Sequence, residues 1–290
     1  MRAAAILGPG NISRCADRFG RIGNAEWVSG LPASSNDADA VVIFGGDGTV
    51  HRYLVHLVSL KLPFLVVPCG SGNDLARALK LLSVRNSLGA WREFAAGGNN
   101  VRAIDLGIIR GGREANIAGG ASAPHYFCCV AGVGIDTEIA RRANALPKWI
   151  RSHGGYALCA PREFLRFAPF PMKVSLGHKD APAAPTILAA FANAPTYGGG
   201  MKIAPQARLD DGKLDVCVVR AMDPFKLFCL FPTVYFGGHL SFREVEYAQT
   251  ETARLETGYP LDVYADGEYV CQTPVEFGVA RNAFKVIVPG

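Results

Sequence analysis

The sequence contains no uninterrupted apolar stretch of the roughly 18–20 residues that a membrane-spanning helix needs, so any membrane contact is expected to be peripheral. It contains no C-x-x-C pair, and its eight cysteines lie mostly inside apolar runs, which is typical of reduced core thiols in a cytosolic protein. A G-x-x-x-x-G-K-[ST] motif is also absent, which excludes a P-loop enzyme. The first apolar run, Ala3–Leu7, is too short for a signal peptide and predicts a strand.

Charged residues are also scarce, at 19% of the chain, and the net charge of +5 is only mildly basic. This charge suits anionic partners such as nucleotide phosphates or acidic lipid headgroups, but it is too weak and too dispersed to indicate nucleic acid. Hydrophobic residues make up 49% of the 290-residue chain, so a sizeable core is expected. The length favours two domains, because single cores stop growing near roughly 250–300 residues.

The first hundred residues alternate between short apolar strands and helices. This pattern predicts an α/β nucleotide-binding domain over residues 1–100, built on an open, mostly parallel sheet. The predicted strands are 3–7, 27–29, 41–44 and 62–67, and the predicted helices are 13–20, 50–60 and 75–82.

From about residue 100 onward, short β-rich segments are separated by glycine and proline turns, apart from a helix expected over residues 156–170. The predicted strands are 101–109, 125–131, 172–176, 186–193, 214–219, 241–250, 252–256, 261–265, 269–272 and 284–288. Their spacing predicts an antiparallel, sandwich-like domain over residues 101–290. The last strand is a candidate to pack back on the first domain.

Two of the predicted strands end in glycine-rich loops, each followed by a predicted helix. Because the carboxyl ends of parallel strands meet at one edge of a sheet, the two loops are expected to face each other across one cleft. Glycine lets an anionic ligand approach backbone N–H groups, and a helix N-terminus adds partial positive charge. Either loop alone could be an ordinary capped turn. The candidate nucleotide-contacting residues are Gly45, Gly46, Asp47, Gly48 and Thr49 in the first loop, and Gly70, Ser71, Asn73 and Asp74 in the second.

Seven motifs, in this order, resemble the diacylglycerol-kinase catalytic family of lipid kinases, which includes bacterial lipid kinases and sphingosine kinases. They are G-G-D-G-T at 45–49, G-S-G-N-D-L-A-R at 70–77, I-D-L-G at 104–107, A-G-V-G-I-D at 131–136, G-G-G-M-K-I-A-P at 198–205, L-D-D-G-K-L-D at 209–215 and D-G-E at 266–268. The resemblance implies ATP and Mg²⁺ as cofactors and a lipid acceptor, such as diacylglycerol, at a membrane surface. A cytoplasmic protein, peripheral at the inner membrane face, is therefore expected, and a homodimer stays open.

The same resemblance assigns roles to the carboxylates. It points to Glu268 as the general base that takes the proton of the acceptor hydroxyl, with Asp266 as an alternative that could instead orient the base or bind metal. Asp47 is expected beside the phosphates and Mg²⁺. A structural Mg²⁺ is implied at Asp210, Asp211 and Asp215, although without the resemblance these residues would indicate only a solvated turn.

Two positions depart from the family pattern. Residues 8–11 read G-P-G-N where the family usually has N-P-x-[SA]-G after its first strand, which bears on nucleotide contacts. Arg52 stands where the family often has a glutamate, which bears on cation handling. Asp105 and Asp136 adjoin apolar strands, where an unpaired carboxylate would be costly. Each could either cap a turn or reach the cleft, and the sequence leaves both roles equally open.

Two further segments suit a lipid substrate. Arg141, Arg142, Lys148 and Arg151 surround Trp149, which is typical of a membrane-surface contact and equally of a solvated helix. The apolar cluster Phe225–Phe236 favours core packing, and part of it could line an acyl-chain slot between the domains. Two rival functions remain open: an NAD kinase-like soluble phosphotransferase, which shares G-G-D-G-T, and a catalytically silent lipid- or nucleotide-binding module.

Overall fold

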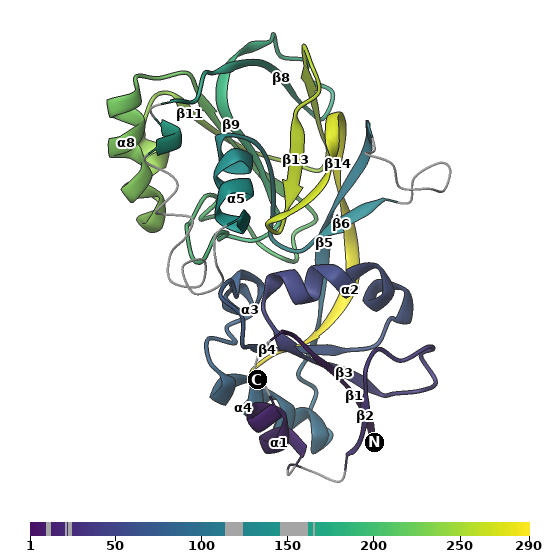
Figure 1. Cartoon of the computed structure of the whole chain (residues 1–290). Coiled ribbons are helices and arrows are strands. Elements are labelled where there is room, and N and C mark those ends of the chain that lie inside the picture. The colour runs from purple at the N-terminus through teal and green to yellow at the C-terminus, as the bar shows by residue number, and fades with distance from the viewer. Residues whose placement is uncertain (10–12, 21, 23–24, 114–123, 146–161, 165) are drawn as a thin grey trace. The chain divides into compact units, whose positions relative to one another are not determined.

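The computed structural model describes residues 1–9, 13–20, 22, 25–113, 124–145, 162–164 and 166–290 (Figure 1). The chain forms two compact units: Met1–Asp105 with Arg281–Gly290, and Leu106–Ala280. The strands β5 (Val101–Arg113) and β14 (Glu268–Ile287) run from one unit into the other. In the helix expected over 156–170, residues 156–161 and 165 lie outside the described residues, and residues 162–164 and 166 are helical. The prediction was wrong from residue 167 onward, because the helix has ended there and a strand begins at Phe170.

Unit 1 contains a sheet in which β1 pairs with β2 and β3, and β4 pairs with β3 and β14, all in parallel. Its order is β2-β1-β3-β4, and the end of β14 joins beside β4 through Val286 and Phe64. The central strand β3 is buried at all six positions, as its uninterrupted apolar sequence predicts. The bounds are β1 (Arg2–Leu7), β2 (Glu26–Ser29), β3 (Ala40–Gly45) and β4 (Phe64–Pro68).

The helices of unit 1 are α1 (Ser13–Gly20), α2 (Asp47–Leu60), α3 (Asp74–Ala78) and α4 (Val84–Ala95). The prediction of a helix through residue 82 was wrong: Lys80 has a left-handed φ of 60°, which cannot continue a helix. Helix α4 was not predicted, although its cap has a recognisable signal, because the side chain of Ser83 accepts a hydrogen bond from the backbone N–H of Asn86.

Unit 2 is strand-rich, and its strand pairings with known register are all antiparallel. One path runs β11-β10-β9-β7-β13-β14, while β12 pairs with both β14 and β8, and β8 returns to β9. The bounds are β6 (His125–Phe127), β7 (Val130–Gly134), β8 (Phe170–Leu176), β9 (Ala184–Ala192), β10 (Leu214–Arg220), β11 (Val245–Thr250), β12 (Ala253–Thr257) and β13 (Asp262–Ala265).

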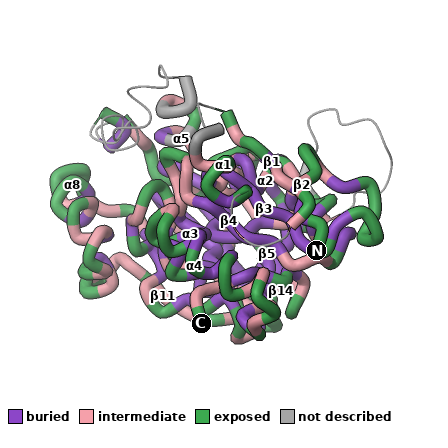
Figure 2. Tube along the Cα trace, turned by 90° about the horizontal axis from the view of Figure 1, so that it is seen from below, coloured by how far each residue is buried: buried purple, intermediate pink, exposed green. Residues whose placement is uncertain are grey.

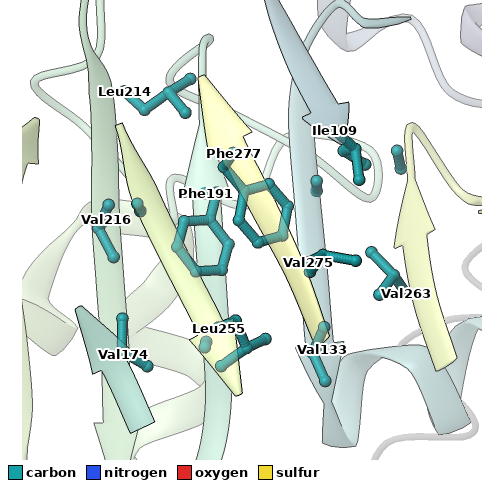
Figure 3. Packing of buried hydrophobic residues seen from close by; sticks show 14 of the residues in the cluster. Ile109, Val133, Val174, Phe191, Leu214, Val216, Leu255, Val263, Val275 and Phe277 are labelled. Atoms are coloured by element: carbon teal, nitrogen blue, oxygen red, sulfur yellow. The ribbon is translucent and has the colours of Figure 1, made fainter. Parts of the chain in front are cut away.

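The core of unit 2 lies between these strands (Figure 3). At its centre the rings of Phe191, from β9, and Phe277, from β14, stack with centroids 3.7 Å apart. Inward-facing residues of the surrounding strands complete the cluster, as expected for strands with one buried face. In unit 1, a second stacked pair, Phe64 and Phe284 at 4.1 Å, packs the end of β14 against β4.

The helices of unit 2 are α5 (Ile135–Ala145), α8 (Pro224–Thr233) and the short 3₁₀ turns η1 (Val234–Phe236) and η2 (Gly238–Ser241). Strand β11 begins at Val245 rather than at the predicted residue 241, because η2 occupies the preceding residues. The predicted strands 269–272 and 284–288 belong to the single strand β14. Among the described residues, no helix is long and apolar enough to span a membrane.

Candidate functional site

The two glycine loops of unit 1 are joined by the carboxylate of Asp47. Its Oδ2 accepts a hydrogen bond from the backbone N–H of Asp74 at 2.9 Å, and its Oδ1 accepts one from Leu75 at 3.1 Å. In return, the N–H of Asp47 donates to the carbonyl of Gly72 at 3.2 Å. The side chain therefore caps helix α3 from the neighbouring loop.

The glycines of the two loops pack backbone against backbone. A Cβ atom on Gly46 would overlap the carbonyl oxygen of Gly72 and lie 2.9 Å from the Cα of Gly70. A Cβ on Gly70 would in turn lie 2.7 Å from the backbone nitrogen of Gly46. The absence of a side chain at both positions therefore lets the loops approach each other, while the predicted contact of these glycines with a nucleotide stays a prediction.

Within the second loop, Asn73 closes the turn on itself. Its Oδ1 accepts from the N–H of Gly70 at 3.1 Å, and its Nδ2 donates to the Gly70 carbonyl at 2.7 Å. The buried carboxylate of Asp74 pairs with Arg77 at 2.5 Å. Ser71 is exposed at the tip. Asn73 and Asp74 therefore hold the shape of the loop.

Helix α2 begins immediately after Gly46, which serves as its N-cap without any side-chain hydrogen bond. The side chain of Thr49 is 8% exposed and packs below Gly45 and Gly8, since a Cβ on Gly8 would lie 2.9 Å from the Thr49 Oγ1. Packing accounts for Thr49, and its contact with a phosphate stays a prediction. Gly48, in the first turn of α2, is half-buried.

In unit 2, Asp266 and Gly267 form the two-residue turn of the β13–β14 hairpin. Both have positive φ, 52° and 87°, which is the conformation of a type I′ turn and explains the Asp-Gly sequence. The carboxylate of Asp266 accepts hydrogen bonds from the backbone N–H groups of Cys128 and Cys129, both at 2.8 Å. Asp266 therefore fixes the turn that precedes β7.

Glu268 follows this turn as the first residue of β14 and is paired with Ala265 across the hairpin. Its side chain is exposed, and the structure records no hydrogen bond or ion pair between it and another described residue. Of the two carboxylates in D-G-E, Glu268 is thus the one that is available to a substrate.

Asn193 contributes to the same turn and was missed by the sequence analysis. Its Nδ2 donates to the carbonyl of Cys128 at 2.9 Å, and its backbone N–H donates to the carbonyl of Cys129 at 2.8 Å. The side chain is completely buried directly after β9. An asparagine at the end of an apolar run was the available signal, because a buried amide must find hydrogen-bond partners.

The three candidate ligands of a structural cation have separate protein partners. Asp215 is buried and accepts hydrogen bonds from Tyr247, at 2.5 Å, and Gln249 of the adjacent strand, while burial raises its pKa. Asp211 accepts from the N–H of Lys213, and Asp210 pairs with Arg208. Across the described part of the chain, no three His, Cys, Asp or Glu side chains converge as metal ligands. The cation at this turn stays a prediction.

An apolar pocket in unit 2 lies between α5, α8 and β9. Two buried polar atoms in it, the Oδ1 of Asp136 and the Nδ1 of His239, have no hydrogen-bond partner among the residues that the structure describes. Burial raises the pKa of Asp136 to about 7 and lowers the pKa of His239, whose Nε2 lies 3.0 Å from the carbonyl of Ile203. The apolar lining includes Ile139, Phe164, Leu188, Met201, Leu227, Leu230, Phe231 and Val234.

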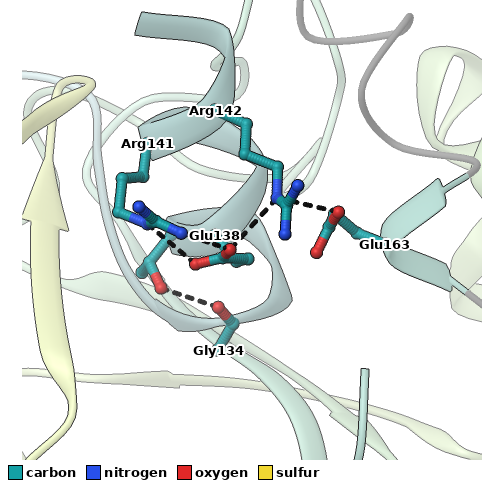
Figure 4. Close-up of polar contacts among 6 residues, drawn as sticks. Gly134, Glu138, Arg141, Arg142 and Glu163 are labelled. Carbon is teal, nitrogen blue, oxygen red and sulfur yellow. Dashed lines mark hydrogen bonds and ion pairs between the residues drawn. The ribbon is translucent and has the colours of Figure 1, made fainter. Parts of the chain in front are cut away.

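Arg141 and Arg142, for which a membrane contact and a solvated helix were equally open, are held in ion pairs (Figure 4). Glu138 lies between them, 2.6 Å from Arg141 Nη2 and 3.1 Å from Arg142 Nε. Arg142 also pairs with the buried Glu163 at 2.9 Å. Their charge is therefore locally neutralised, and the rest of the predicted segment, Lys148–Arg151, lies outside the described residues.

Three further candidates lie in unit 1: Asp105, Arg52 and the segment 8–11. The carboxylate of Asp105 is buried and accepts a hydrogen bond from the N–H of Asn282 at 2.7 Å, which favours the turn-capping alternative. Arg52 is exposed on α2. The predicted nucleotide loop at residues 8–11 lies largely outside the described residues.

Comparison with known proteins agrees with this arrangement. Residues 25–109 match the family model of the diacylglycerol kinase catalytic domain, and residues 129–288 match the YegS C-terminal NAD kinase beta sandwich-like domain. The chain belongs to the diacylglycerol kinase family of lipid kinases. A diacylglycerol kinase of Mycobacterium tuberculosis is 32% identical over 257 residues, which cover 89% of this chain and 79% of that protein.

Solved structures of this kinase family share the fold. The crystal structure of a diacylglycerol kinase from Bacillus anthracis superposes with a TM-score of 0.67 at 17% identity, covering 99% of this chain and 96% of that chain. An NAD kinase from Archaeoglobus fulgidus in complex with ATP gives a TM-score of 0.54 at 13% identity, covering 100% and 94% of the two chains. The strand-rich C-terminal unit is thus a sandwich-like domain of a kind that both classes of kinase contain.

Proposed function

We propose that this kinase transfers the γ-phosphate of ATP to a hydroxyl group of a membrane lipid such as diacylglycerol. The observation that carries the proposal is the pair of glycine loops at the ends of β3 and β4, joined by Asp47, in a chain that belongs to a lipid kinase family. Phosphoryl transfer depends mainly on positioning and on charge stabilisation, and loops held this firmly can provide both.

The nucleotide phosphates are assigned to the N-terminus of α2. This 14-residue helix has no side-chain cap at Gly46, so a phosphate oxygen can accept from the backbone N–H of Gly48 and gain from the helix dipole. A magnesium ion bound with ATP would neutralise phosphate charge. Asp47 and Asp74 are the carboxylates with which these two loops would contact this magnesium ion. Both carboxylates also contact protein groups, since Asp47 accepts from the N–H of Asp74 and Asp74 pairs with Arg77. We therefore assign them positioning roles.

The acceptor hydroxyl is assigned to Glu268. This carboxylate is exposed, so it can take the hydroxyl proton as the lipid oxygen attacks the γ-phosphorus and ADP departs. Asp266 cannot serve equally well, because both of its oxygens already accept backbone hydrogen bonds. Asp266 instead positions Glu268 through the rigid hairpin turn.

The acyl chains are assigned to the apolar pocket in unit 2. Its lining suits hydrocarbon, and the unpartnered Oδ1 of Asp136 and Nδ1 of His239 could each pair with a polar group near the lipid glycerol. The cavity is small, about 40 Å³, so the walls must separate to admit a chain. This pocket lies within unit 2. The acyl-chain slot between the domains stays a prediction.

A soluble NAD kinase is the second candidate, because an NAD kinase shares the fold with a TM-score of 0.54. A direct assay separates the two functions. The purified protein is incubated with γ-³²P-labelled ATP and either diacylglycerol vesicles or NAD, and the products are identified. We expect label in lipid and none in NAD. Labelled NADP without labelled lipid would overturn the proposal, and ATP binding without any transfer would indicate a silent module.

A further inference from the structure

Helix α8 is apolar on both of its faces. Its inner face buries Leu227 and Leu230 and, with Phe231 and the following Val234, forms one wall of the apolar pocket. A helix that is hydrophobic all round normally lies inside a protein or in contact with lipid. The inner face of α8 follows this rule because it lines the pocket inside the protein. The hydrophobic outer face needs a separate explanation.

The outer face of α8 exposes two aromatic rings, and the turn η1 that follows the helix exposes a third. Phe225 is 76% exposed, Phe228 is 53% exposed, and Phe236, in the turn that follows, is 85% exposed. Phe225 and Phe228 are three residues apart and therefore lie on one side of the helix, and the exposed positions Cys229 and Pro232 carry no charge. Figures 1 and 2 both show α8 at the margin of its unit, and Figure 2 shows exposed positions along it.

The charges beside this face are paired with one another. Lys226 Nζ lies 2.7 Å from Glu244 Oε1, and Arg243 Nε lies 2.8 Å from the same oxygen. These contacts hold the pKa of Glu244 down to about 2, so the carboxylate stays ionised and the cluster keeps its pairing across the physiological range. Because the two cations Lys226 and Arg243 share this one carboxylate, a partner that covers the rings meets a cluster with a net positive charge, which suits anionic lipid headgroups.

The size of the face argues against a second copy of the chain. A ten-residue helix is about 15 Å long and 10 Å wide, so its outer face offers on the order of 150 Å². A stable protein interface needs about 800 Å² from each partner. A bilayer has no such minimum, because a few aromatic side chains inserted at its surface suffice for reversible binding.

We propose that the outer face of α8, with Phe225 and Phe228, docks the protein onto the lipid bilayer together with Phe236 of η1. The bilayer would then contact one face of α8, while the other face lines the acyl-chain pocket. A lipid could therefore enter the pocket from the bilayer without crossing water. This inference rests on the proposed function for its choice of partner. It places the membrane contact on α8 rather than on the predicted segment around Arg141 and Arg142.

The test uses the full chain and phosphatidylcholine–phosphatidylglycerol vesicles, without ATP or diacylglycerol. The variant carries Phe225→Ser, Phe228→Ser and Phe236→Ser, and its vesicle-bound fraction is measured by co-sedimentation. We expect binding at least about tenfold weaker than for the unmodified chain, with the same thermal unfolding midpoint, because the rings are more than half exposed. The matched control carries Val55→Ser and Leu82→Ser, two exposed apolar positions in unit 1 that are 56% and 69% exposed, and should bind normally.

A second readout reports on the face directly. An environment-sensitive fluorophore on Cys229, which is exposed between the rings, should shift its emission to the blue when vesicles are added. The Cys229→Ser chain, treated with the same reagent, corrects for labelling elsewhere.

Unchanged sedimentation of the triple variant would overturn the inference. So would a dimer, seen by light scattering at assay concentrations, that the three substitutions abolish, since a second copy would then cover the face. The proposed function is tested separately. If vesicle binding requires the three rings but no lipid is phosphorylated, the docking inference is supported and the lipid kinase activity is contradicted. Transfer to a short-chain, water-soluble diacylglycerol should be unchanged in the triple variant.

Discussion

The Oδ2 atom of Asp47 lies 2.9 Å from the backbone nitrogen of Asp74, so a carboxylate in one glycine loop caps the helix that starts in the other. Replacing it removes the acceptor of two N–H groups. We expect Asp47→Ala to lower the free energy of unfolding by about 1–3 kcal/mol, measured by urea denaturation. Asp17→Ala, at an exposed position on α1, is the control and should change stability by less than about 0.5 kcal/mol. Equal stability of the two variants would contradict the capping role.

The contact between Gly46 and Gly70 predicts a strict requirement for glycine. Gly46→Ala should prevent the loops from closing and destabilise the protein by several kcal/mol or more, because the added Cβ meets backbone rather than a flexible side chain. Gly89→Ala, on the exposed side of α4 with nothing within 4 Å of its Cβ, should stabilise by up to about 1 kcal/mol. Thermal unfolding of both variants checks the contrast, and a stable Gly46→Ala protein would refute the close packing.

The buried Asp136 predicts a dependence of stability on pH. Its pKa rises from about 3.8 unfolded to about 7 in the fold, so the folded chain keeps the proton that the unfolded chain loses. The contribution of Asp136 to stability should be greatest below pH 4, fall between pH 4 and 7, and level off above pH 7, with a total change of at most about 4 kcal/mol.

The neutral variant Asp136→Asn isolates this effect. Its advantage over the unmodified chain should grow from pH 4 to pH 7 and then stay constant. Urea unfolding at pH 4.5, 6 and 7.5 measures it. A difference that does not vary with pH would show that the Asp136 carboxyl titrates normally.

The ion pair of Arg142 with the buried Glu163 predicts an asymmetry between neighbouring arginines. Arg142→Met leaves Glu163 without its cation and should cost up to about 3 kcal/mol of stability, and adding Glu163→Gln should restore much of it. Arg141→Met, which removes an exposed partner of Glu138, should cost less than about 1 kcal/mol. Chemical denaturation of the single and double variants gives the coupling free energy, and a value near zero would contradict the pairing.

The sequence predicted much of the secondary structure because local signals were strong. The apolar run of β3, the helix Ser13–Gly20 and most of the antiparallel strands stand close to their expected positions. Helix α8 was not predicted as a helix, since its apolar residues lack helical periodicity when both faces are hydrophobic. Strand β14 was predicted as two strands, because its polar stretch around Arg281 and Asn282 resembles a turn.

The candidate site contains long-range contacts that local sequence signals do not predict. The sequence placed Gly46 and Asp266 in special turns, and both turns exist. Their partners could not be predicted: Asp266 binds the backbone of Cys128, which lies 138 residues away, and backbone N–H groups carry no sequence signature. The packing of Gly46 on Gly70 likewise depends on the separation of two neighbouring strands, which periodicity does not specify.

The most direct test of the central claim is the transfer of ³²P from γ-labelled ATP to diacylglycerol by the Glu268→Gln variant. Glu268 is exposed at the start of β14, so the substitution should leave the thermal unfolding midpoint unchanged. We expect lipid phosphorylation to fall at least about 100-fold, because the amide cannot accept the hydroxyl proton. Full transfer by this variant, or no transfer to any lipid by the unmodified chain, would contradict the account.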